Sequence, residues 1–188
     1  MNKVVVCAAK RTPFGKFGGA LVKIGAVELG ALVINKVLLE VPQVEASEVD
    51  EVILGNCLPG NGLSPARQSV LAAGWPLTAN ALTIDRACCS ALTAAGLCYQ
   101  HISGGFARIC VAGGTENMSR TPYLIHQMRW GQRLGDFMVE DDLVIRNPYV
   151  GAPMAKYVGE FALEKNITRN DLDAWALRSH KLWADAYR

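Results

Sequence analysis

Hydrophobic residues in the first two thirds of the chain form short runs that alternate with segments of helical spacing. The runs are bounded by charged residues, Gly or Pro, which is typical of buried strands. They predict strands over residues 3–9, 51–55, 81–84 and 108–112. Helical spacing predicts helices over residues 26–39, 66–73 and 89–103. This alternation favours an α/β fold with a layered, largely parallel sheet.

The pattern changes after residue 118. Residues 119–150 contain two prolines and scattered aromatic side chains without a clear period, so we expect a long excursion from the core. Long ordered loops of this kind are often functional. The sequence therefore predicts a core over residues 1–118 and a separate region over residues 119–188.

Two further helices are predicted near the C-terminal end, over residues 151–165 and 169–187. Thr168 is a favourable N-cap for the second helix, with Asp171 three residues later. The sequence ends inside this helix without a return strand.

Composition and charge exclude several classes of protein. The 188 residues carry 19 Lys and Arg against 17 Asp and Glu, and this balance argues against a nucleic-acid-binding protein. The apolar stretch at the N-terminus is too short for a secretory signal, and no apolar run is long enough to span a membrane. The six cysteines follow neither a zinc pattern nor a secreted disulfide framework. We therefore expect a cytoplasmic protein without a metal site.

The junction between the third predicted strand and the following helix is the most informative segment. Cys88 lies at this turn, at the carboxyl end of the sheet, where open α/β folds place their sites. The N–H groups of the helix N-terminus favour a thiolate there and could hold an oxyanion. The alternative is that Cys88 is only a small residue in a tight turn. For Cys89 we expect a packing role, and for Ser90 hydrogen bonds to the backbone.

Four sequence motifs, in order, carry a family resemblance that covers essentially the whole chain. They are AKRTPFGKFGG (residues 9–19), EVILGNCLP with PARQ (51–59 and 65–68), the Cys88 junction, and VAGGTENMS (111–119). Together they resemble the N-terminal half of the thiolase family, which includes acetyl-CoA acetyltransferases and 3-ketoacyl-CoA thiolases. A condensing enzyme of the ketoacyl-synthase kind is a weaker alternative, because the Arg-Thr-Pro opening favours a thiolase.

The resemblance implies an acyl-CoA acyltransferase of fatty acid metabolism. Cys88 would carry the acyl group during Claisen condensation or thiolysis of 3-ketoacyl-CoA, and its own N–H would be one oxyanion donor. CoA and acyl-CoA would be substrates, with no further cofactor. The fold would be the first of two similar halves of a layered α/β/α structure, and residues 119–188 would form most of the inserted loop domain that helps to hold CoA.

The sequence departs from the family pattern in two places. Around the nucleophile it has Cys89 and Ala91 where the family commonly has Gly or another small residue, and we expect the turn to tolerate both. In the loop domain, Tyr149 and Val150 stand where biosynthetic members often have His-Met. Tyr149, Val150 and Met154 are therefore candidate substrate-binding residues, with packing of the loop domain as the alternative.

The family also requires a histidine in a Gly-His-Pro context and a second cysteine in a Gly-rich turn. None of His101, His126 and His180 has that context. The hypothesis is that this chain is the nucleophile-bearing subunit of a split, hetero-oligomeric thiolase, and that a second polypeptide supplies the histidine and the second cysteine. The alternatives are a truncated or inactive structural or regulatory subunit and, more remotely, a redox sensor that uses Cys88 and Cys89.

Overall fold

The computed structural model describes residues 3–58, 62–144 and 151–187. The chain divides into two compact units, Met1–Leu143 and Val144–Arg188. The domain boundary expected after residue 118 stays a prediction.

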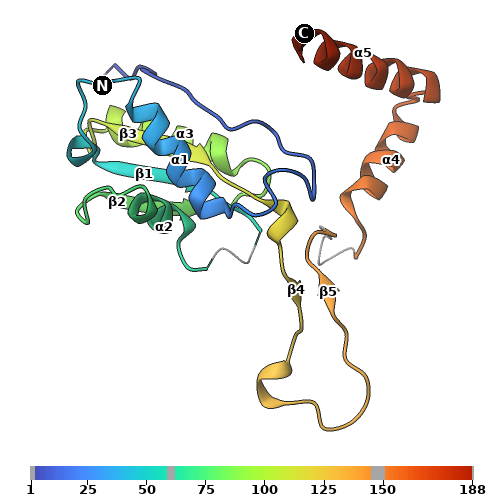
Figure 1. Ribbon diagram of the computed structural model, residues 1–188. Coiled ribbons are helices and arrows are strands. Elements are labelled where there is room, and N and C mark those ends of the chain that lie inside the picture. The colour runs from blue at the N-terminus through green and yellow to red at the C-terminus, as the bar shows by residue number, and fades with distance from the viewer. Residues whose placement is uncertain (1–2, 59–61, 145–150, 188) are drawn as a thin grey trace. The chain divides into compact units, whose positions relative to one another are not determined.

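A three-stranded parallel sheet forms the centre of the first unit (Figure 1). Its strands, in the order β2-β1-β3, are β1 (Glu51–Gly55), β2 (Asn80–Ile84) and β3 (Cys110–Gly114). Gly55 at the end of β1 lies opposite Ile84 on one side and Gly114 on the other. The three carboxyl ends are therefore level and form one edge of the sheet.

Helices cover both faces of this sheet. They are α1 (Ala26–Leu38), α2 (Pro65–Ala72) and α3 (Ser90–Ser103). Because successive side chains of a strand point to opposite faces, Val52 packs in one cluster with Ile34 of α1 and Val70 of α2. Ile53 packs on the other face, against Ala94 of α3. These layers confirm the predicted α/β/α fold with a parallel sheet.

The strand prediction was wrong at the N-terminus and shifted for β3. Residues 3–9 form no strand, and Val6 is 89% exposed. Their apolar pattern is compatible with a strand, but a strand also needs a neighbour for its backbone hydrogen bonds, and the described part of the chain provides none. Strand β3 begins and ends two residues later than predicted, so it includes Gly113 and Gly114.

The excursion after β3 contains little regular structure. Its elements are 3₁₀ turns over Met118–Arg120 and Met128–Trp130 and two-residue strands β4 (Tyr123–Leu124) and β5 (Glu140–Asp141). Strands β4 and β5 pair antiparallel, and His126 Nε2 lies 2.9 Å from Glu140 Oε2 beside them. This agrees with the expected long, irregular excursion.

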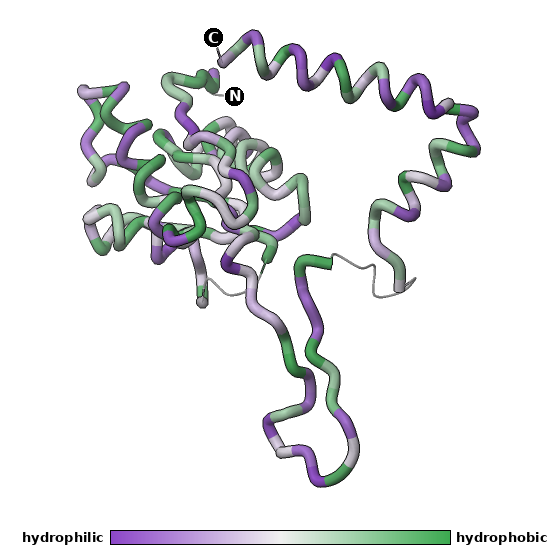
Figure 2. The backbone as a smooth tube through the Cα atoms, turned by 45° about the vertical axis from the view of Figure 1, so that its right-hand side comes forward, coloured by the Kyte–Doolittle hydropathy of each residue, from purple (hydrophilic) through white to green (hydrophobic). Residues whose placement is uncertain are grey.

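The second unit consists of helices α4 (Met154–Glu164) and α5 (Arg169–Tyr187). Thr168 and Asp171 form the expected cap: the Thr168 N–H donates to the Asp171 carboxylate at 2.9 Å, and the Asp171 N–H donates to the Thr168 hydroxyl at 3.3 Å. Hydrophilic and hydrophobic residues alternate along α5 (Figure 2). Among the helices that the structure describes, none is long and apolar enough to cross a membrane.

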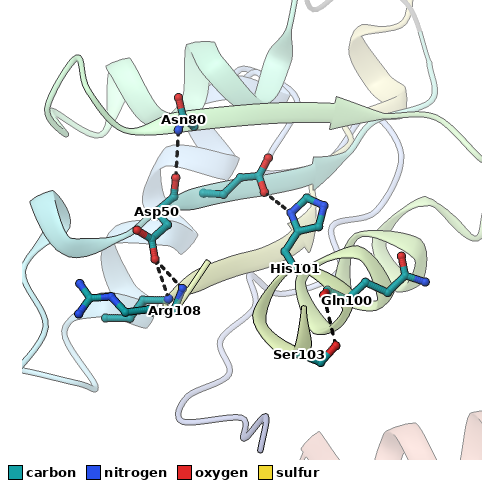
Figure 3. Close-up of polar contacts among 8 residues, drawn as sticks. Asp50, Asn80, Gln100, His101, Ser103 and Arg108 are labelled. Carbon is teal, nitrogen blue, oxygen red and sulfur yellow. Dashed lines mark hydrogen bonds and ion pairs between the residues drawn. The ribbon is translucent and has the colours of Figure 1, made fainter. Parts of the chain in front are cut away.

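Polar contacts connect residues at the amino edge of the sheet (Figure 3). The Asp50 carboxylate accepts the backbone N–H groups of Arg108 at 2.7 Å and Ile109 at 3.0 Å. Next to it, His101 Nδ1 lies 2.6 Å from Glu51 Oε2. The hydrogen bonds from Arg108 and Ile109 lower the pKa of Asp50 below its usual value.

This lowered pKa predicts a pH-dependent contribution of Asp50 to stability. A carboxyl group whose pKa is depressed in the folded state stabilises the fold above its unfolded pKa and loses that contribution as the pH falls through the folded pKa. We therefore expect the difference in unfolding free energy between the unsubstituted chain and Asp50→Asn to be constant near neutral pH and to shrink below about pH 4.

Urea denaturation at a series of pH values measures this difference. Asp185→Asn, on an exposed position of α5 in the second unit, removes the same charge and serves as the control. If the difference in unfolding free energy stayed unchanged down to strongly acidic pH, the ionised Asp50 carboxylate would not stabilise the fold.

Candidate active site

A tight turn over residues 85–89 joins β2 to α3 and carries Cys88. Ala87 has a φ angle of 48°, in the left-handed region that residues with a Cβ rarely adopt. The Asp85 side chain compensates by accepting the Ala87 N–H at 2.8 Å. The turn is therefore held in a conformation that an unsupported peptide would rarely adopt.

The buried hydroxyl of Ser90 fixes the other side of the turn. It accepts the N–H of Arg86 at 2.8 Å and donates to the carbonyl of Ala87 at 2.6 Å. Ser90 is 5% exposed, so its hydroxyl is occupied by backbone groups rather than offered to a substrate. This confirms the role expected for Ser90. Cys89 takes the N-cap position of α3, and its carbonyl accepts the Thr93 N–H at 2.9 Å.

Two glycines allow the sheet edge to approach the first turn of α3. A Cβ atom on Gly55 would lie 2.6 Å from Ser90 Cβ, and one on Gly114 would lie 3.0 Å from Ala91 Cβ. Such distances leave no room for side chains on the strand ends. The small side chain of Ala91 fits against Gly114, and the turn forms with Cys89 and Ala91 in place, as expected.

The thiol of Cys88 is exposed at the N-terminus of a 14-residue helix. The unpaired N–H groups and the dipole of such a helix end favour negative charge nearby, whether on a thiolate or on an oxyanion. All six cysteines lie among the described residues and are free thiols. An exposed thiol in this environment has the features of an acyl-accepting nucleophile.

A second cysteine at the same sheet edge lies in a different environment. Cys57 follows β1 and is half-buried, and its Sγ lies 3.4 Å from a carboxylate oxygen of Glu116. Burial, then the hydrogen bond to Glu116 and its charge, and finally the nearby Asp85 and Cys88, raise the pKa of Cys57 to about 11. Sequence reasoning assigned no role to Glu116. Its position two residues after a parallel strand, at the edge that carries Cys88, was the available signal.

The structure does not test the other candidate residues. Tyr149 and Val150 lie outside the described residues. Met154 is the first residue of α4, in the second unit, and is exposed. Their substrate-binding role therefore stays a prediction.

Two of the three histidines contact carboxylates. His101 faces Glu51 at the amino edge of the sheet, near the far end of α3, a helix of ~20 Å. His126 pairs with Glu140, and His180 lies on α5. Within the described ranges, no histidine hydrogen-bonds to Cys88, and no group of three or more His, Cys, Asp or Glu side chains could hold a metal ion.

The fold and the junction define a class: layered α/β proteins with an exposed cysteine between a parallel strand and a helix N-terminus. The family model for the N-terminal domain of thiolase matches residues 4–188. The chain belongs to the thiolase family.

Known relatives agree with this assignment. The chain is 40% identical to an acetyl-CoA acetyltransferase of Chromobacterium violaceum over 99% of its length, and 43% identical to a probable acetyl-CoA acetyltransferase of Escherichia coli K12 over 96%. These matches cover 48% and 47% of the relatives. The crystal structure of the Bacillus anthracis acetyl-CoA acetyltransferase matches 97% of this chain with a TM-score of 0.93 and 39% identity, over 47% of that structure. The chain thus spans about half the length of these relatives.

The close approach at Gly55 gives a test of the site geometry. In Gly55→Ala, the new Cβ would overlap Ser90 Cβ and the Ala91 nitrogen, so the first turn of α3 must move. We expect the free energy of unfolding to fall by about 1–3 kcal/mol and alkylation of Cys88 by iodoacetamide to slow.

Gly96→Ala is the matched control, because Gly96 lies in α3 with no atom within 4 Å of a Cβ placed there. Ala there should leave Cys88 alkylation unchanged and stabilise the helix by up to about 1 kcal/mol. Urea denaturation measures the unfolding free energy, and peptide mass spectrometry measures the alkylation of Cys88. If both substitutions changed these two quantities equally, Gly55 would not be closely packed against α3.

Proposed function

We propose that this chain carries the nucleophile of a thiolase-type acyltransferase, which moves acyl groups between CoA thioesters. The observation that supports this most directly is the exposed, free Cys88 thiol at the N-terminus of α3, in a chain of the thiolase family. The reaction is thiolysis of a 3-ketoacyl-CoA or, in reverse, Claisen condensation of two acyl-CoA molecules.

The proposed chemistry has two steps. The Cys88 thiolate attacks the carbonyl carbon of the substrate. In condensation the thioester C–S bond of an acyl-CoA breaks and releases CoA, and in thiolysis the Cα–Cβ bond of the 3-ketoacyl-CoA breaks and releases an acyl-CoA carbanion. The acyl group is left on Sγ as a thioester. In the second step, the carbanion of an acyl-CoA or the thiolate of free CoA takes the acyl group, and Cys88 is regenerated as a thiolate. Backbone N–H groups at the start of α3 stabilise the oxyanion of each step.

Neither step needs an external oxidant or reductant, so we propose CoA and acyl-CoA as substrates and no additional cofactor. Both steps need a proton acceptor and donor, and this supports a partner. Because no described histidine bonds to Cys88, we propose that a second polypeptide supplies the catalytic histidine and second cysteine in a hetero-oligomer. In the loop region, Tyr149, Val150 and Met154 are proposed to contact the substrate. We place this activity in cytoplasmic fatty acid metabolism.

A structural or regulatory subunit is the second candidate function. It is favoured because no described histidine is a hydrogen-bond partner of Cys88. In that case Cys88 would not accept an acyl group, even in the presence of the partner.

Mass spectrometry of the chain incubated with acetyl-CoA separates the two functions. We expect one acyl group on the peptide that contains Cys88, formed slowly in the lone chain because the loss of a general base costs about 10²–10⁴-fold in rate. Cys88→Ser should abolish the labelling, whereas Cys89→Ser, the neighbouring exposed thiol, should retain it.

The partner is tested by native mass measurement and identification of the chains that co-purify with this one. We expect steady-state turnover of a 3-ketoacyl-CoA only in the complex. Full turnover by the pure lone chain would contradict the need for a partner. An unlabelled Cys88 in the active complex would contradict its role as nucleophile.

A further inference from the structure

Glu116 joins the ends of two parallel strands. It lies two residues after β3, and its Oε1 accepts the side-chain amide of Asn56 at 2.9 Å. Its Oε2 accepts the backbone N–H groups of Cys57 at 2.9 Å and Leu58 at 3.2 Å, and also the Cys57 thiol at 3.4 Å. One half-buried carboxylate therefore organises three consecutive residues after β1.

These three residues lie beside the turn that carries Cys88. Gly55 is level with Ile84 in the sheet, and the Asn56 N–H donates to the Ile84 carbonyl at 3.1 Å, one residue before the turn. Cys57 is close enough to Asp85 and Cys88 for both to affect its titration electrostatically. Residues 56–58 therefore lie at the same edge of the sheet as the exposed Cys88 thiol.

Only a carboxylate satisfies this set of contacts. Every group that faces Glu116 is a donor, and an ionised carboxylate accepts at both oxygens. A glutamine of the same shape would direct its NH₂ group either at the Asn56 amide or at the N–H groups of Cys57 and Leu58. In both orientations, donors face each other and lose the carboxylate oxygen that Glu116 provides.

We propose that Glu116 is a positioning residue that fixes residues 56–58 beside Cys88 and keeps the Cys57 thiol engaged as a hydrogen-bond donor, so that Cys57 does not compete with Cys88 for an electrophilic thioester. The part that concerns thioesters rests on the proposed function. Burial first and then Glu116 raise the pKa of Cys57 to about 11, which keeps this thiol protonated near neutral pH, and only the thiolate is nucleophilic.

The test measures the alkylation rate of each cysteine by iodoacetamide in the full chain, by peptide mass spectrometry, from neutral to alkaline pH. In Glu116→Gln we expect alkylation of Cys57 at pH 8 to accelerate by about tenfold or more, since each unit of lowered thiol pKa gives about ten times more thiolate. The pH profile of Cys57 should move to lower pH. An unchanged Cys57 rate and profile would overturn the proposal.

Two controls separate this effect from general loosening of the fold. Cys98 is buried between α3 and the sheet, with a pKa raised to about 12, mainly by burial, and reports unfolding. Its rate should not change in Glu116→Gln. Glu40→Gln removes a carboxylate from the exposed pair with Lys10 and should alter neither Cys57 nor Cys98.

If Glu116→Gln also exposes Cys98, Glu116→Asp decides the question. Aspartate keeps a charged acceptor at shorter reach, so Cys57 should regain part of its protection relative to the glutamine variant. A Cys57 that reacts as fast in Glu116→Asp as in Glu116→Gln would overturn the proposal.

Incubation with acetyl-CoA then distinguishes this inference from the proposed function. We expect label on Cys88 alone in the unsubstituted chain, and on Cys57 as well in Glu116→Gln. Absence of label from Cys88 in every chain, with or without the partner, would refute the proposed function, while the iodoacetamide profile of Cys57 would still decide the role of Glu116.

Discussion

The close approach between the carboxyl edge of the sheet and the first turn of α3 is the constraint on which the site depends. Gly55 and Gly114 end neighbouring strands, and the positions that their Cβ atoms would take are already filled by Ser90 and Ala91. This contact brings the start of α3 down onto the sheet edge. The turn between β2 and α3 must then be short, with Ala87 in the left-handed region and Ser90 bonded to the backbone. In this turn Cys88 is exposed.

The two edges of the sheet in the first unit carry polar groups of different kinds. At the amino edge, the Asp50 carboxylate accepts backbone N–H groups and the Glu51 carboxylate contacts the His101 ring, so both carboxylates have partners within the fold. At the carboxyl edge, the Glu116 carboxylate likewise accepts hydrogen bonds from its donors, whereas the Cys88 thiol is exposed. An α/β sheet places its site where the strands end, and the polar groups of this chain follow that rule: those at the opposite edge serve stability.

The sequence was sufficient to predict the layered fold, most of the helices and the position of Cys88. Strand and helix periodicities are strong local signals, and the junction follows from their order. The strand expected over residues 3–9 failed because periodicity reports which side chains are apolar and does not report whether a neighbouring strand exists. The role of Glu116 was not predicted, since its contacts with residues 56–58 join positions about 60 apart in sequence, and no local pattern encodes such a pairing. The substrate-binding role of Tyr149, Val150 and Met154 remains a prediction.

The strand order has a consequence for how the chain matures during synthesis. The central strand β1 comes first in sequence, and its two neighbours follow later, so the sheet closes only when β3 is available. Contacts between distant segments form slowly, because a long loop must be ordered before they form, and domains emerge from the ribosome N-terminus first. Until residue 116 has been made, Cys57 has no carboxylate to hold it, and both thiols of the future edge are present in an unfinished fold. The order of the strands therefore sets a period during translation in which Cys57 lacks the contact with Glu116 that it has in the folded chain, and this period ends when β3 docks.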